Sequence, residues 1–307
     1  MDGELVAEEI RPSASPKRWI VVTERDIEIL KLIHDYRLLR IEQIEALTGR
    51  TYTRVHRRLK GLYDGGYLKR RSFPQKKDIY YINRAGLALL LSEGLITDDE
   101  ATRRSREHEL KPQTLDHEML IADIHLMLTI ATRTGPFELT AWREGEEIRD
   151  TFEVVDNGAP RKITIAPDAF FQLKDRASTN SRTFFVEVDR GTMVTVPRPG
   201  SQRFRDKIER YRSFINADRP VQRYAATAIR ILTVTLTRAR SQNLCADTDA
   251  FLTQTNSPRL RKSFLFGSLK DISIAEPQSI LAPVFHRPGS EKTFPLLPPL
   301  AETGERD

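Results

Sequence analysis

The chain has 307 residues, a formal net charge of +6 at pH 7 and a single cysteine, Cys245. Two hydrophobic cores fit in this length, since domains typically run about 100 to 150 residues, and the positive charge favours an acidic partner such as nucleic acid. One cysteine excludes an internal disulfide and a zinc ribbon. There is no apolar run of about 18 residues and no basic start followed by an apolar stretch, which indicates a cytoplasmic protein without a membrane span.

The first part of the chain predicts a flexible N-terminus over residues 1–18 and a winged helix over residues 19–96. Thr23 and Asp26 form a capping box at the head of an amphipathic helix, and Gly49 ends a second helix. The remaining predicted elements are a third helix over 51–64, strands over 67–71 and 78–82 around a polar tip at 72–77, and a fourth helix over 84–93.

The third of these helices has an apolar stripe and a basic face. Its apolar residues Val55, Leu59 and Leu62 recur at helical spacing, so we expect the opposite, arginine-bearing side to face outward. Between residues 50 and 77 the only acid is Asp64. Arginines on such a helix can reach guanine edges in the major groove, and the basic residues of the wing can neutralise phosphates. We predict that double-stranded DNA is bound by Arg50, Thr53, Arg54, Arg57, Arg58, Lys60, Lys69, Arg70, Arg71, Lys76 and Lys77. A solvated face on a domain that contacts proteins is the alternative.

The rest of the chain predicts a linker, an α/β domain and a tail. Residues 97–114 are dense in charge and predict a linker or an exposed helix. Helices and strands alternate over residues 115–268, which predicts an α/β domain. Its elements are a helix over 115–131, strands near 137–142, 148–155, 163–173 and 183–188, a basic helix over 202–215 and a strand over 229–237. Residues 269–307 are rich in proline and predict an irregular C-terminal tail.

Carboxylates stand at the ends of two of these predicted strands. Asp168 follows the apolar run 163–167, and Glu187 and Asp189 alternate with valines, so both acids share one strand face. Oxygen-rich clusters suit a hard cation such as Mg²⁺ or Mn²⁺, and clustered carboxylates repel unless a cation or a proton relieves them. We predict that Asp168, Glu187 and Asp189 hold a metal ion used in phosphodiester chemistry. The alternative is that they are solubilising strand ends or partners of arginines such as Arg190.

Five segments follow one another in a distinctive order. After the basic segment comes an apolar helix opening with Asp116-His117, then a strand with the letters PDAFF from Pro167, then one with EVDRGT from Glu187, and then the basic helix. The last three resemble the PD-(D/E)XK nuclease-like fold. The whole order, over residues 20–240, resembles the replication-relaxation family of plasmid and mobile-element proteins. The resemblance implies a winged helix-turn-helix, a restriction-endonuclease-like α/β domain and a role in plasmid replication or DNA relaxation.

The resemblance also implies roles for single residues. In the nuclease-like fold two acids hold magnesium, and a lysine two positions after the second acid activates or orients water. Asp168 and Glu187 match the two acids, but Asp189 stands where the lysine is expected. Lys207 on the following helix is the best candidate for the missing lysine and Lys174 is the second, although Lys207 also fits a phosphate-binding or solvent face. Candidates for a further ligand from the helix over residues 115–131 are Asp116, Glu118 and Asp123, and His117 is either a helix cap or a ligand.

The resemblance thus implies a DNA-binding protein of a plasmid or mobile element, with metal-dependent nicking or cleavage of DNA. Two alternatives stay open because of Asp189. One is a transcriptional or copy-number regulator whose second domain has lost catalysis and forms a homodimer. The other is an adaptor that recruits replication or relaxase proteins. A serine elbow, a phosphate loop and a zinc-binding cluster are all missing from the sequence, which argues against those classes of enzyme.

Overall fold

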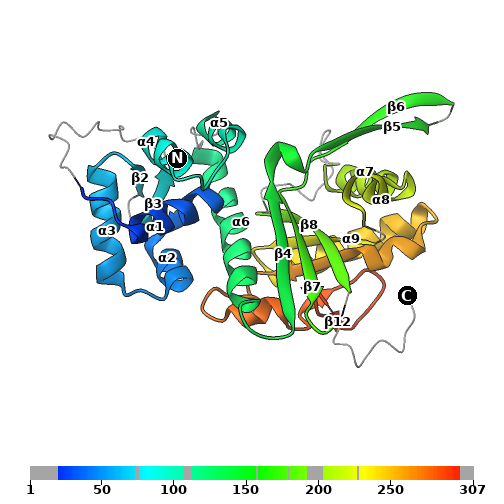
Figure 1. Cartoon of the computed structure of the whole chain (residues 1–307). Helices are drawn as coiled ribbons and strands as arrows, with labels where there is room; N and C mark the ends of the chain where they lie inside the picture. Colours follow the sequence, from blue (N-terminus) through cyan, green and yellow to red (C-terminus); the bar gives the residue numbers. More distant parts are fainter. Residues whose placement is uncertain are drawn as a thin grey trace, which may run out of the picture. The chain divides into compact units, whose positions relative to one another are not determined.

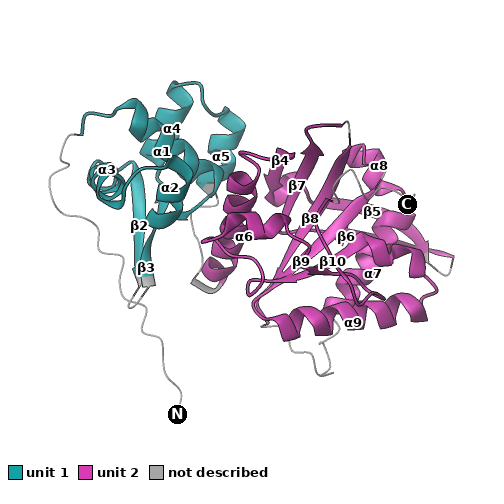
Figure 2. Ribbon diagram, turned by 90° about the horizontal axis from the view of Figure 1, so that it is seen from below, with its two compact units in different colours: residues 1–110 teal, residues 111–307 magenta. Residues whose placement is uncertain are grey.

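The computed structural model (Figure 1) describes residues 20–73, 76–106, 112–156, 158–178, 180–191, 203–226 and 228–297. The chain forms two compact units, residues 1–110 and residues 111–307 (Figure 2). Both contain helices and strands, which confirms the predicted mixed α and β class. Within the described ranges no helix is long and apolar enough to cross a membrane. The predicted flexible start, residues 1–18, lies outside the described residues.

The first unit has helices around a small sheet. In the sheet order β1-β3-β2, both neighbouring pairs are antiparallel. The strand β1 was not predicted, because two residues are too few to show an alternation. The elements are α1 (Glu24–Asp35), β1 (Leu39–Arg40), α2 (Ile41–Thr48), α3 (Tyr52–Asp64), β2 (Leu68–Phe73), β3 (Lys76–Ile82), α4 (Arg84–Ser92) and α5 (Asp98–Arg106).

Local sequence signals explain how these helices begin and end. The backbone N–H of Thr23 donates to Asp26 Oδ2 at 2.8 Å, which closes the predicted capping box of α1. Gly49 ends α2 with a φ of +67°, a left-handed conformation that glycine adopts without strain. The helix α5 contacts α4 and belongs to the first unit. None of its described side chains is buried, so part of the charge-dense segment predicted as a linker or exposed helix is a helix with exposed and partly exposed residues.

The second unit is built on a mixed sheet with the strand order β12-β11-β10-β9-β8-β7-β4, in which β8, β9 and β10 run parallel. Two further strands, β5 and β6, form a separate antiparallel ribbon. The elements are α6 (Pro112–Ala131), β4 (Phe137–Glu144), η1 (Gly145–Glu147), β5 (Asp150–Asp156), β6 (Ala159–Ile165), β7 (Ala169–Asp175), β8 (Ser181–Asp189), α7 (Arg203–Asn216), α8 (Arg219–Tyr224), β9 (Ile229–Thr235), α9 (Arg238–Gln254), η2 (Pro258–Ser263), β10 (Phe264–Ser268), η3 (Pro277–Leu281), β11 (Phe285–His286) and β12 (Thr293–Phe294).

Each face of the large sheet has its own apolar core. On one face, Phe184 and Val186 of β8 pack with residues of α6 and η3. On the other face, Phe185 of β8 packs with residues of α7 and α9. Alternate residues of a strand point to opposite faces, so Glu187 lies on the α7 side with Phe185. Both faces of β8 are therefore covered.

The predicted strand over residues 163–173 is two strands. The ribbon strand β6 ends at Ile165 and the sheet strand β7 begins at Ala169. Pro167 lies in the gap and has no N–H for a ladder bond. The next residue, Asp168, binds the β8 backbone instead: its N–H donates to the carbonyl of Val186 at 3.0 Å. The break places Asp168 at the point where the chain passes from the ribbon to the sheet.

Residues 269–297 differ from the predicted irregular tail. The strand β11 pairs with β10, and β12 pairs with β11, so this segment extends the large sheet. Ile280, Phe285 and Leu296 are fully buried in the core on the α6 side. The prolines are spaced widely enough to leave apolar residues that complete this core. The last part of the predicted tail, residues 298–307, lies outside the described residues.

Candidate functional site

Glu187 is the centre of a buried polar cluster in the second unit. It lies near the end of β8, and only 3% of its surface is exposed. Lys207 Nζ of α7 donates to Glu187 Oε2 at 2.5 Å. The Tyr211 hydroxyl, one helical turn further along α7, donates to Oε1 at 2.5 Å. Both oxygens of this buried carboxylate are therefore satisfied by one face of α7.

Burial and charge act on the ionisation of this pair. Burial raises the pKa of Glu187, and the charge of Asp168 raises it further, against the opposing effect of Lys207. Burial lowers the pKa of Lys207, but the negative charges of Glu187, Asp168 and Asp189 outweigh that effect and the pKa is raised overall. All three predicted acids thus act on Lys207, the best candidate for the missing lysine, and hold it as a cation.

Asp168 connects β8 to α6. Its Oδ2 accepts the backbone N–H of Val188 at 2.7 Å, and its Oδ1 lies 3.0 Å from His117 Nε2. The hydrogen bond to Asp168 raises the pKa of His117, against the effect of burial. His117 was one of four candidates on this helix, and it contacts a predicted acid. Asp116 instead pairs with Arg190 at 2.8 Å.

Asp189 has different partners from the other two acids. Its Oδ1 accepts the backbone N–H of Gly191 at 2.6 Å, and its Oδ2 pairs with Arg240 of α9 at 2.8 Å. Asp189 is 3% exposed, so the ion pair with Arg240 compensates a buried charge. Asp189, which stands where the lysine was expected, thus forms an ion pair with α9. No local pattern in the sequence predicts this pair.

The structure brings some predicted site residues together and separates others. Asp168, Glu187 and Lys207 belong to one cluster, whereas Lys174 stands at the other end of β7 from Asp168. Among the described residues, no group of three or more Asp, Glu, His or Cys side chains is arranged to hold a metal ion. Tyr211 is a site residue that was not among the predicted ones. Its position four residues after Lys207, on the same face of the helix, is the sequence feature that could have identified it.

The predicted DNA-binding residues of the first unit fall into two groups. Thr53, Arg54 and Arg57 are exposed on α3, opposite the fully buried Val55 and Leu59. Neither arginine forms an ion pair with any residue that the structure describes. Arg71 is partly exposed on β2, where its charge acts on Tyr81, and the side chain of Lys76 lies outside the described part of the chain.

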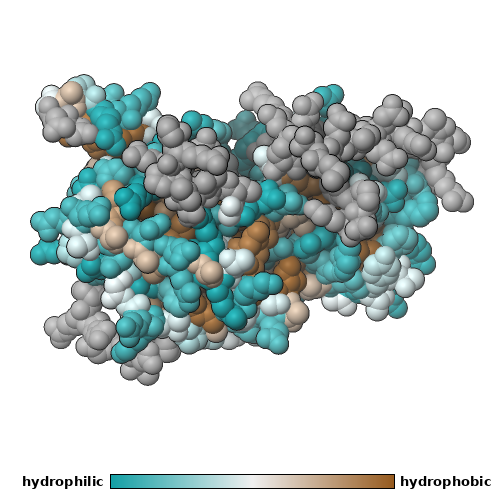
Figure 3. Space-filling model, turned by 180° about the vertical axis from the view of Figure 1, so that it is seen from behind, coloured by the Kyte–Doolittle hydropathy of each residue, from teal (hydrophilic) through white to brown (hydrophobic). Residues whose placement is uncertain are grey.

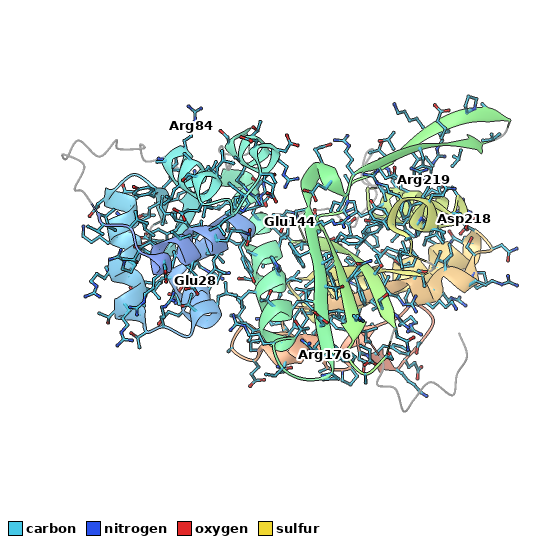
Figure 4. All side chains as sticks on the ribbon, in the orientation of Figure 1. Glu28, Arg84, Glu144, Arg176, Asp218 and Arg219 are labelled. Carbon is cyan, nitrogen blue, oxygen red and sulfur yellow. The ribbon has the colours of Figure 1, made fainter. Side chains whose placement is uncertain are left out.

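The other basic residues have partners inside the first unit. Arg58 pairs with Asp26, which is fully buried, so Arg58 holds α3 to the start of α1. Lys69 lies over the ring of Tyr81, with Nζ 5.9 Å from the ring centroid. The remaining ion pairs are Arg50 with Glu28 (labelled in Figure 4) at 2.5 Å, Lys60 with Asp64 at 2.6 Å, Lys77 with Glu42 at 2.7 Å and Arg70 with Asp78 at 3.4 Å. Pairs at the surface are weak, so these cations remain able to exchange their partners for phosphates.

Comparison with known protein families gives a match over most of the chain. The family model described as replication-relaxation matches residues 30–230. No curated protein and no solved structure matches the chain. The matched range holds α3 with its exposed arginines and the whole Asp168–Glu187–Lys207 cluster. Because the match spans more than half of the 307 residues, the chain belongs to the replication-relaxation family.

Proposed function

We propose that this protein binds double-stranded DNA through its first unit and cuts the DNA backbone through its second unit, during replication of a plasmid or another mobile element. The main support for DNA binding is the difference between the cations of α3 that are paired with a described residue and those that are not. Arg54 and Arg57 are exposed without an ion pair to any described residue, while Arg50, Arg58 and Lys60 around them are paired. Family membership supports the role in replication.

The arrangement of elements supports a winged helix as the DNA-binding module. The helix α3 follows α2 after a short turn at Gly49, and its apolar stripe packs inward. The hairpin of β2 and β3 follows directly and carries Lys69, Arg70 and Lys77. A recognition helix places its outward side chains in the major groove, so Arg54 and Arg57 would contact base edges and the hairpin cations would contact phosphates.

The Asp168–Glu187–Lys207 cluster supports the cutting reaction. Mg²⁺ is commonly bound by one or two carboxylates together with substrate phosphates, and Asp168 and Glu187 supply two carboxylates close enough for one to raise the pKa of the other. Bound there, Mg²⁺ or Mn²⁺ would supply Lewis-acid stabilisation of charge on the phosphate. A third ligand at Asp189 does not fit, because Asp189 is paired with Arg240.

The chain's own residues would orient the reacting groups. Lys207 is a charged donor that could turn from Glu187 to a non-bridging phosphate oxygen, where negative charge develops during cleavage. Tyr211 would keep Glu187 in place when Lys207 moves, because it holds the other oxygen. His117 would orient Asp168 through the contact at Oδ1.

A second candidate is a regulator or adaptor without catalysis, in which the second unit serves homodimerisation or recruits replication or relaxase proteins. The pairing of Asp189 with Arg240 favours this second candidate. Asp189 occupies the position of the usual catalytic lysine, and its ion pair with Arg240 is a structural contact. The closed hydrogen bonding of Glu187 also favours it. Both candidates share DNA binding by α3.

A binding titration tests the shared claim. A pool of duplex DNA fragments of varied sequence is titrated with the wild type and with Arg54→Ala/Arg57→Ala, and binding is followed by gel shift. The control is Arg25→Ala/Arg84→Ala, which removes two exposed arginines from α1 and α4. Each lost base contact should cost about 1 to 3 kcal/mol, so the α3 variant should bind weakly and lose sequence preference while the control binds as the wild type. Equal binding by all three would refute the proposal.

A further inference from the structure

A polar cleft lies between the ribbon strand β6 and the helix α7. Its volume is about 360 Å³. The ribbon of β5 and β6 extends away from the large sheet, and α7 lies beside it (Figures 1 and 2). The cleft is lined by Arg161, Lys162, Ile163 and Thr164 of β6 and by Asp206, Glu209 and Arg210 of α7.

Both walls of the cleft are fixed to the body of the second unit. Ile163 of β6 and Ile208 of α7 are buried in the same core cluster. Asp150, the first residue of β5, accepts two hydrogen bonds from Arg219 of α8, both at 2.9 Å, and Arg219 is labelled beside the ribbon in Figure 4. A ligand would therefore meet a cleft that is already formed, which lowers the entropic cost of binding.

The charges in the cleft favour an anion. Three cations and two acids line it, and one of the acids is already compensated: Glu209 accepts two hydrogen bonds from Arg212, at 2.7 and 2.8 Å. Lys162 and Arg210 are exposed, and neither forms an ion pair with a residue that the structure describes. Two cations on facing walls are thus accessible to a bound anion.

The same helix serves the cleft and the polar cluster around Glu187. Lys207 and Tyr211 bind Glu187, and the residues one position before each, Asp206 and Arg210, line the cleft. On the other wall, β6 ends at Ile165, three residues before Asp168. Residues three positions apart on a helix are neighbours on its surface. Arg210 and Lys207 are three positions apart on α7, so an anion bound at Arg210 is held close to Lys207.

We propose that this cleft binds phosphate groups of the DNA backbone, whatever the base sequence, and holds the strand beside Lys207. This proposal rests on the proposed function, because it takes DNA as the ligand of the second unit. Backbone rather than base contact is favoured by the described lining residues, which include lysine and arginine but no aromatic side chain on which a base could stack. The cleft would thus supply non-specific affinity in the second unit, separate from sequence recognition by α3.

The test is the salt dependence of DNA binding by the full chain. The cleft variant Lys162→Ala/Arg210→Ala is compared with Lys270→Ala/Lys292→Ala, which removes two exposed lysines elsewhere in the second unit. Each phosphate contact contributes about 0.9 to the slope of log K against log salt on duplex DNA, so the cleft variant should show a slope about 1.8 less steep than the control. The loss should be equal for specific and unrelated duplexes. If the alanine variant melts at a lower temperature, Lys162→Gln/Arg210→Gln replaces it.

The outcomes separate this proposal from the DNA-binding role of α3. A slope and affinity equal to those of the control would overturn the cleft assignment even if Arg54→Ala/Arg57→Ala abolishes sequence preference. Conversely, if the α3 variant binds like the wild type while the cleft variant loses slope, the cleft is supported and the assignment of α3 fails. No binding of DNA by the wild type would overturn both.

Discussion

Two adjacent arginines of α3 have opposite roles because their partners differ. Arg57 is exposed and free of ion pairs to the described residues, whereas Arg58 compensates the fully buried carboxylate of Asp26. Arg58→Ala should lower the free energy of unfolding by about 3 kcal/mol, since it leaves a buried charge without its partner. Arg57→Ala should change it by less than about 0.5 kcal/mol and should weaken DNA binding. Urea unfolding of both variants measures the difference, and equal stabilities would contradict these roles.

The Asp26–Arg58 pair also predicts a dependence of stability on pH. Burial would raise the pKa of Asp26, but the hydrogen bonds from Arg58 and Thr23 and the charge of Arg58 lower it below 3.8 overall. An acid with a lowered pKa in the folded state adds stability above its unfolded pKa, and this stability is lost as the pH falls through the folded pKa. The wild type should therefore be more stable than Asp26→Asn at neutral pH, and the difference should shrink below about pH 4. A constant difference in urea midpoints down to about pH 2 would exclude this linkage.

Among the helices and strands, the sequence predicted the ones that are marked by a pattern of neighbouring residues. The capping box at Thr23 and the stripe of Val55, Leu59 and Leu62 located α1 and α3, because both signals depend on residues within a turn or two. The partners of the α3 cations were not predictable in this way. Asp26 lies 32 residues from Arg58 along the chain, so only the packed fold shows which basic residues remain available for DNA.

The C-terminal strands show a second limit of local patterns. Residues 269–297 looked irregular because of their prolines, yet β11 joins the large sheet beside β10. The ring of Phe285 lies where a side chain on Gly267 would stand, since a Cβ there would meet the ring at 2.7 Å. This fit between two strands depends on tertiary packing, which the spacing of apolar residues does not encode.

The packing of β11 gives a stability prediction. Phe285 is fully buried in the core on the α6 side of the sheet. Phe285→Ala should lower the free energy of unfolding by about 3 to 5 kcal/mol because it removes a buried ring and leaves a cavity. The exposed Lys292 in the same segment provides the control, and Lys292→Ala should change stability by less than about 0.5 kcal/mol. Thermal or urea unfolding that finds no loss for Phe285→Ala would mean that this segment is indeed a tail.

For the whole molecule, the length of 307 residues allowed two hydrophobic cores, and the chain forms two compact units. The net charge of +6 predicts an acidic partner, which stays a prediction. The face drawn in Figure 3 is mostly hydrophilic, with hydrophobic residues showing in small areas between polar ones. The order of motifs identified the family because it extends over most of the chain. The chemistry of the acids was harder to predict, since Arg240 and Tyr211 reach them from separate helices.

The division of tasks between the units makes the account testable as a whole. If the first unit recognises DNA and the second cuts it, substitutions at Glu187 or Lys207 should leave DNA binding nearly unchanged. Losing transition-state stabilisation at the phosphate costs several kcal/mol of activation free energy, so cleavage should fall below detection. A non-catalytic regulator would instead bind DNA with and without these substitutions and never cut it.

The most direct measurement is a plasmid topology assay. Supercoiled plasmid is incubated with the wild type, with Glu187→Gln and with Lys207→Met, each in Mg²⁺, in Mn²⁺ and with a chelator, and the products are separated on agarose gels. We expect nicked or linear plasmid only with the wild type and a metal ion, and gel shifts should show that both variants still bind DNA. Plasmid that stays supercoiled with the bound wild type under every condition, or cleavage that survives both substitutions, would contradict it.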